Sequence, residues 1–149
     1  MREARTCWPV LVRKAQDAVN EAQNDIVQAL ARVDQLQASH QRLCKLYDEY
    51  RLQEHASQTP VMGMQASMNH RQFMTQLLQL QQRVVVDLGK AQSTLAQMRQ
   101  KRLQAEIELH KMKSLAEQDA KAVAQDVKRY EQRQMDELGV RQFIMNMGT

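Results

Sequence analysis

Residues 12–50 read VRKAQDAVNEAQNDIVQALARVDQLQASHQRLCKLYDEY, a stretch without proline or glycine. Apolar and aromatic residues recur along it at alternating steps of three and four, interrupted only by a histidine. This spacing is a heptad repeat, which is typical of a coiled-coil helix. The repeat positions are Val12, Ala15, Val19, Ala22, Ile26, Ala29, Val33, Leu36, His40, Leu43, Tyr47 and Tyr50.

A second stretch repeats the pattern after a break that contains Pro60 and Gly63. When the chain is folded back at this break, the two series oppose each other, and small residues often face large ones. In this register Ile26 faces Met98. The sequence therefore predicts an all-α fold of two long helices in an antiparallel coiled-coil hairpin, with helix 2 longer than helix 1. The second series is Met74, Leu77, Gln81, Val84, Leu88, Ala91, Leu95, Met98, Arg102, Ala105, Leu109 and Met112.

We expect one coiled-coil domain over residues 1–149, with helix 1 at about 10–55, a loop at about 56–68 and helix 2 at about 69–143. Pro9 fits the first turn of helix 1, and Ser67 or Asn69 offers an N-cap for helix 2. Gly89 costs helix 2 about 1 kcal/mol relative to alanine without ending it. The polar seam residues are expected to fix the register rather than to bind a ligand; they are His40, Gln81 and Arg102.

The inequality of the helices leaves helix 2 without a partner beyond about Leu115. An isolated amphipathic helix is marginally stable in water, yet an apolar stripe continues along this overhang. Of the two outcomes, fraying or cover by another protein, the second is favoured. The stripe is Ala116, Ala120, Val123, Val127, Tyr130 and Leu138. Apolar residues also flank the seam near the loop, as a surface patch or as a locally widened core: Leu46, Phe73, Leu78 and Leu80.

The composition excludes several functional classes. The 21 basic and 17 acidic residues are interspersed, which indicates solvated helix faces rather than a nucleic-acid site. No stretch is apolar for long enough to span a bilayer. Residues 1–12 carry charges and a proline where a signal peptide needs an apolar run. The two distant cysteines, Cys7 and Cys44, suit a reducing cytosol, so we expect a cytoplasmic protein.

The sequence lacks the motifs of phosphate-binding, dinucleotide-binding, zinc-protease and nucleophile-elbow sites. The four histidines show no metal-ligand spacing, and a two-helix coiled coil has no concave pocket that excludes water. We therefore expect no enzyme activity, no catalytic residue, no cofactor and no metal. The histidines are His40, His55, His70 and His110.

Three stretches carry a resemblance to a known family. Residues 43–51 read LCKLYDEYR, residues 69–77 read NHRQFMTQL, and residues 131–137 read EQRQMDE. In order and on a hairpin of unequal helices, they resemble the end of helix 1, the start of helix 2 and the C-terminal signature of the flagellar export protein FliJ family. These proteins are short, Gln-rich helical hairpins of bacterial flagellar type III secretion.

The resemblance implies a monomeric central stalk, similar to the γ subunit of rotary ATPases. Its termini would enter the hexameric flagellar export ATPase ring and promote ring assembly and turnover. It would also contact the export-gate protein FlhA, which places it at the cytoplasmic side of the membrane, and bind flagellar export chaperones. The implied gate-contact residues are Leu43, Tyr50, Phe73 and Leu77. The expected ring-contact residues on the overhang are Val123, Val127, Tyr130, Arg133, Gln134, Met135, Asp136 and Glu137.

Some positions depart from the family pattern. Leu46 stands where the family can carry an aromatic residue, Leu80 where it can carry alanine, and Val84 where it can carry histidine. These departures weigh against a hydrogen-bonded gate contact and leave an apolar one as the expectation. Two alternatives stay open: the equivalent stalk of a virulence injectisome, and a generic coiled-coil scaffold or homodimer. The C-terminal signature favours the flagellar system.

Overall fold

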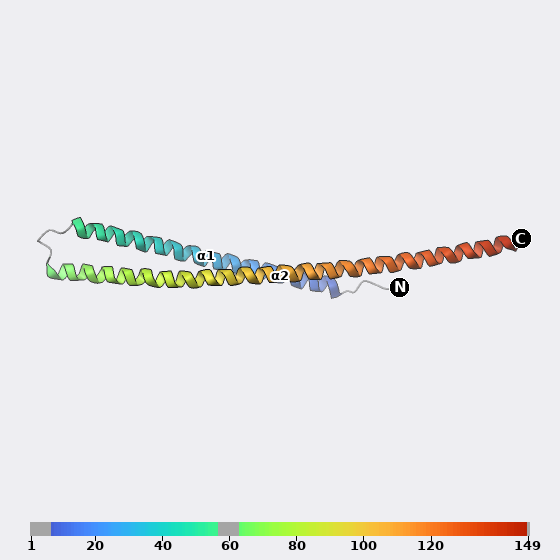
Figure 1. Ribbon diagram of the computed structural model, residues 1–149, viewed down its shortest axis with the longest axis horizontal. Helices are drawn as coiled ribbons and strands as arrows, with labels where there is room; N and C mark the ends of the chain where they lie inside the picture. Colours follow the sequence, from blue (N-terminus) through green and yellow to red (C-terminus); the bar gives the residue numbers. More distant parts are fainter. Residues whose placement is uncertain (1–6, 57–62, 149) are drawn as a thin grey trace. The chain divides into compact units, whose positions relative to one another are not determined.

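The computed structural model describes residues 7–56 and 63–148, with the backbone alone at residues 55 and 56. It contains two helices, α1 (Cys7–Ala56) and α2 (Met64–Met147), and these described ranges contain no strand (Figure 1). The predicted all-α fold with a longer second helix is confirmed. The chain divides into two compact units. We call residues 22–102 the hairpin unit, and residues 7–21 with 103–148 the terminal unit.

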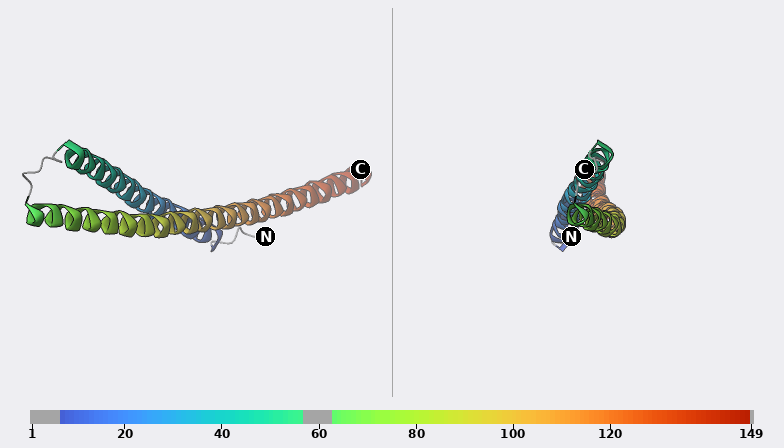
Figure 2. Two further views of the ribbon diagram at one scale, coloured as in Figure 1. Left: turned by 60° about the vertical axis from the view of Figure 1, so that its left-hand side comes forward. Right: turned by 90° about the vertical axis from the view of Figure 1, so that its left-hand side faces the viewer.

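The hairpin unit is an antiparallel helix pair, as Figure 1 and the left view of Figure 2 show. Its core is a seam of aliphatic side chains in which Ile26 and Val33 of α1 pack with Leu95 of α2. Half-buried side chains of both helices pack against this cluster: Ala29, Leu88, Ala91 and Met98. All of these residues belong to the two predicted heptad series. The remaining buried residues of the unit also lie on those series: Ala22, Leu36, Met74 and Leu77.

Polar contacts between the helices agree with the predicted register. The amide Nε2 of Gln81 donates to the backbone carbonyl of Leu43 over 3.2 Å, and these two residues face each other in that register. The guanidinium Nη1 of Arg102 donates to Gln23 Oε1 over 2.8 Å. Two of the three polar seam residues thus bond across the seam. The third, His40, lies 3.7 Å from the thiol of Cys44 on its own helix.

Both helices extend beyond their expected bounds. Cys7 rather than Val10 begins α1, so Pro9 still lies in the first turn, where its missing N–H removes no intrahelical hydrogen bond. Met64 begins α2, ahead of the expected N-caps, because Gly63 supplies the first carbonyl acceptor, to the N–H of Ser67 at 3.3 Å. At its other end α2 passes Phe143 and continues to Met147.

The terminal unit consists of the first turns of α1 and the last part of α2. Ala15 is its buried residue on α1, at a predicted seam position. On α2, Leu115, Val123 and Val127 are partly buried, whereas every residue from Lys128 through Gly148 is exposed. We call residues 128–148 the exposed segment. The sequence predicts that helix 2 lacks a partner beyond about Leu115. In the structure, the stretch in which every residue is exposed begins only at Lys128.

Candidate functional site

The loop end of the hairpin unit carries an aromatic cluster that joins the two helices. The ring of Tyr50 on α1 lies 4.7 Å from that of Phe73 on α2, centroid to centroid and tilted by 54°, which is within the favourable range for aromatic pairs. The imidazole of His70 lies 6.2 Å from the Tyr50 ring. We call Tyr50, His70 and Phe73, with Glu54, the aromatic cluster.

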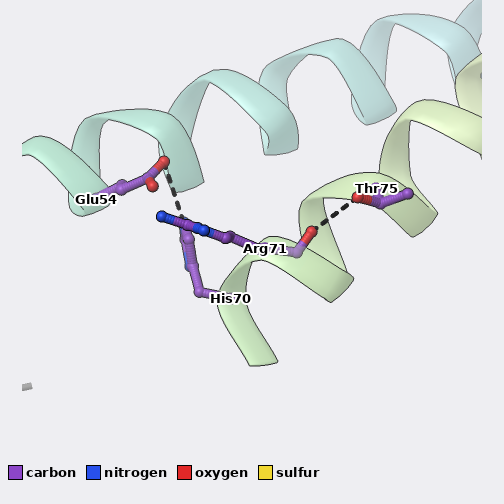
Figure 3. A network of polar contacts seen from close by, with 4 residues as sticks. All are labelled: Glu54, His70, Arg71 and Thr75. Carbon is purple, nitrogen blue, oxygen red and sulfur yellow. Dashed lines mark hydrogen bonds and ion pairs between the residues drawn. The ribbon is translucent and has the colours of Figure 1, made fainter. Parts of the chain in front are cut away.

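His70 also connects the two helices through a polar contact. Its Nε2 atom lies 3.6 Å from the carboxylate of Glu54 on α1. Figure 3 shows the imidazole extending from α2 toward that carboxylate, and the hydroxyl of Thr75 at the carbonyl of Arg71 one turn along α2. That hydroxyl donates to the Arg71 carbonyl over 2.9 Å, so it is held by its own helix. The cluster therefore combines tilted aromatic rings in contact with one inter-helix polar contact.

The four gate-contact residues expected from the resemblance differ in accessibility. Leu77 is only 3% exposed and is part of the seam. Leu43, Tyr50 and Phe73 are half-buried, and the carbonyl of Leu43 accepts the Gln81 hydrogen bond described above. The structure brings Tyr50 and Phe73 together as a surface. It places Leu77 beneath the surface, where its side chain supports the fold.

Sequence reasoning missed His70 and Glu54 as members of this cluster. A signal for both was present, because the predicted register places Glu54 opposite His70 as it places Leu43 opposite Gln81. Prediction from the sequence pairs only apolar positions across the seam, so it does not find the polar pair beyond Tyr50. Applying the same register to polar residues would have identified the contact that the structure shows.

The expected ring-contact residues lie along α2 in the terminal unit. Val123 and Val127 are partly buried. The other six belong to the exposed segment: Tyr130, Arg133, Gln134, Met135, Asp136 and Glu137. Polar side chains of this stretch bond within the helix, since Gln134 Nε2 donates to the Tyr130 hydroxyl over 2.9 Å. Gln132 Nε2 likewise donates to Asp136 Oδ1 over 3.2 Å.

The last turns of α2 carry an apolar face that sequence reasoning did not find. Its residues recur at the i, i+3, i+4, i+7 spacing of an amphipathic helix, and each is more than half exposed: Val140, Phe143, Ile144 and Met147. The helix was expected to end at about residue 143, so this face was not considered. The spacing of these apolar residues could have predicted the face. Gly139 does not interrupt α2, so the helix continues through all four of them.

In the described parts of the chain, no group of three or more His, Cys, Asp or Glu side chains could hold a metal ion. Over the same ranges, neither helix has a stretch long and apolar enough to cross a membrane. The two surface features that the structure presents are the aromatic cluster and the exposed segment.

The family model described as the flagellar FliJ protein matches residues 9–148 of the 149-residue chain. The chain belongs to the FliJ family. It is therefore a protein of flagellar type III protein export. The match spans almost the whole of α1 and α2, so it covers both the aromatic cluster and the exposed segment. No curated protein and no solved structure matches the chain.

Proposed function

We propose that the chain is the central stalk of the hexameric flagellar export ATPase. The observation that carries this proposal is the exposed segment, in which every residue of the helix is open to solvent. Such a helix is marginal alone and is stabilised by insertion into another protein. In the ring, this segment promotes assembly and ATP turnover. The chain itself contributes no catalytic residue and no cofactor.

The ring-entering segment presents two kinds of contact. Tyr130 and Met135 supply apolar surface, while Arg133, Asp136 and Glu137 supply charges for the polar lining of a pore. Val123 and Val127 continue the apolar stripe towards the hairpin unit. The apolar face of the last turns, from Val140 to Met147, extends the same contact beyond the residues named from the sequence.

We infer further that the aromatic cluster is the contact for the export-gate protein FlhA. Tyr50 and Phe73 form its accessible apolar surface, and the half-buried Leu43 lies about two turns before Tyr50 on α1. Leu77 supports that surface from the seam. This contact keeps the chain at the cytoplasmic side of the membrane through protein rather than lipid. Flagellar export chaperones are further partners, and nucleic acid is not a partner.

Hydrolysis of ATP by the cognate export ATPase tests the stalk role. The full chain is compared with a form that ends at Val127 and so lacks the exposed segment. Stimulation by the full chain and its loss on truncation are expected. Equal stimulation by both forms would show that the exposed segment is not the ring contact. Stimulation by neither form would contradict the stalk role.

The alternatives predict different measurements. The family match favours the flagellar system over a virulence injectisome, and an injectisome stalk would stimulate the injectisome ATPase in preference to the flagellar one. A scaffold or homodimer requires self-association, whereas the stalk is a monomer when free. Sedimentation equilibrium across a range of concentrations distinguishes the two.

A further inference from the structure

The buried aliphatic seam stops short of the loop end of the hairpin unit. Among the described residues, no side chain of α1 after Leu36 is buried, and none of α2 before Met74. Residues 51–54 of α1 are all exposed. Figure 1 and the left view of Figure 2 show the two helices diverging toward this end. The turns that carry Glu54 and His70 are therefore joined by contacts of the aromatic cluster rather than by buried aliphatic side chains.

The four residues of the aromatic cluster form two facing pairs. Tyr50 and Glu54 lie four apart on α1, whereas His70 and Phe73 lie three apart on α2, so each pair shares one face of its helix. Between the helices, the rings of Tyr50 and Phe73 lie 4.7 Å apart, and Glu54 lies 3.6 Å from His70. The His70 ring is also 6.2 Å from the Tyr50 ring. Tyr50 therefore has two aromatic neighbours on α2, about one turn apart.

The carboxylate of Glu54 holds the imidazole of His70 in this position. The His70 side chain is 19% exposed, and its Nε2 atom is shielded from solvent and makes no hydrogen bond to the described residues. A buried polar atom left without any partner costs free energy. The Glu54 carboxylate is a charged acceptor 3.6 Å from that atom, and Figure 3 shows the imidazole directed at it. Without this carboxylate, we expect the imidazole to turn toward solvent and away from Tyr50.

We propose that His70 and Glu54 are positioning residues for the contact with the export gate. Their contact holds the ends of the two helices together, and the imidazole keeps the Tyr50 ring against Phe73 before the partner arrives. A surface that is already ordered in the free protein loses less conformational entropy on binding. Neither positioning residue needs to touch the partner. The inference rests on the proposed gate contact and adds to it the residues that prepare the surface.

Binding of the full chain to the cytoplasmic part of FlhA, measured by isothermal titration calorimetry, tests the proposal. His70→Leu and Glu54→Ala each remove one side of the contact and should weaken binding roughly three- to tenfold, because the rings must then be ordered on binding. The double variant should bind no more weakly than either single variant, since both changes act through one contact. His70→Gln keeps an N–H donor and should retain affinity within about twofold.

A matched control and a spectroscopic measurement separate positioning from charge. Glu49→Ala removes a carboxylate from an exposed position of α1 outside the cluster, and it should bind within about twofold of the unaltered chain. In the free chain, the nuclear Overhauser effect between the ring protons of Tyr50 and Phe73 reports the ring position. This signal should be clearly weakened in His70→Leu and Glu54→Ala and kept in His70→Gln and Glu49→Ala, with helical circular dichroism unchanged in all four.

An unchanged ring signal in both His70→Leu and Glu54→Ala would overturn the proposal, and so would equal weakening of binding by Glu49→Ala. Additive losses in the double variant with the ring signal kept would mean that the two residues touch the partner themselves, which would also overturn it. Absence of FlhA binding by the unaltered chain would contradict the gate contact on which the proposal rests. Retained binding with an unchanged ring signal would overturn the positioning role alone.

Discussion

The side-chain amide of Gln81 on α2 donates a 3.2 Å hydrogen bond to the backbone carbonyl of Leu43 on α1. This bond ties a polar position of one seam to the backbone of the other helix, between the aliphatic core and the aromatic cluster. A polar residue at a seam position specifies register because only one alignment satisfies it. The alignment that satisfies Gln81 also brings Glu54 to His70.

Removing the Gln81 hydrogen bond is expected to weaken the hairpin. Gln81→Ala should lower the free energy of unfolding by about 1 kcal/mol, the usual net value of one hydrogen bond. Urea unfolding followed by circular dichroism measures this change. Gln82→Ala, at the exposed neighbouring position, is the matched control. An unchanged midpoint for Gln81→Ala would show that the bond does not contribute to stability.

Substitution of Gly89 is expected to stabilise the hairpin. A Cβ atom built on this residue meets nothing within 4 Å, and its φ is not positive, so alanine fits without strain. Gly89→Ala should therefore stabilise the chain by up to about 1 kcal/mol through helix propensity. The readout is the midpoint of thermal unfolding. A fall in that midpoint would contradict the open surroundings that the structure gives this residue.

Leu77 and Leu78 are neighbours in sequence but differ in environment, with exposed fractions of 3% and 47%. Leu77→Ala should cost about 2–5 kcal/mol because it leaves a cavity in the seam. Leu78→Ala should change stability by no more than about 0.5 kcal/mol. Urea unfolding of the two variants tests this contrast. Similar costs at both positions would contradict the assignment of Leu77 to the core.

Ala22 tests how tightly the helices pack. It is fully buried, so Ala22→Leu should overpack the seam and destabilise the chain by about 1–3 kcal/mol. Ala31→Leu introduces the same side chain at an exposed position of α1 and should leave stability nearly unchanged. Calorimetry of both variants gives the comparison. Tolerance of leucine at residue 22 would mean that the helices separate there more readily than the structure indicates.

The seam was predictable from sequence because it depends on residue type and spacing alone. The heptad spacing predicts Ile26, Val33 and Leu95 as seam residues, and all three are buried. Helix ends were less predictable: α2 begins at Met64, directly after Gly63, and continues to Met147, past the expected end at about residue 143. The surface hollow beside Ala29 and Ala91 could not be predicted, since it depends on how far the surrounding side chains extend in three dimensions.

The candidate surfaces were likewise predictable only in part. Tyr50 and Phe73 were named from a family resemblance, and the structure places their rings together. Leu77 was named with them, but its burial shows that one linear motif can contain both surface and core residues. The late apolar face from Val140 to Met147 was missed because the helix was expected to end too early.

Site-specific photocrosslinking tests most directly whether the exposed segment binds the export ATPase and the aromatic cluster binds FlhA. A photoreactive phenylalanine analogue replaces either Tyr130 or Tyr50 in the full chain, which is then mixed with the export ATPase hexamer and the cytoplasmic part of FlhA. We predict that the probe at residue 130 crosslinks to the ATPase and the probe at residue 50 to FlhA. The reverse pattern, or crosslinking of both probes to the same partner, would contradict the account.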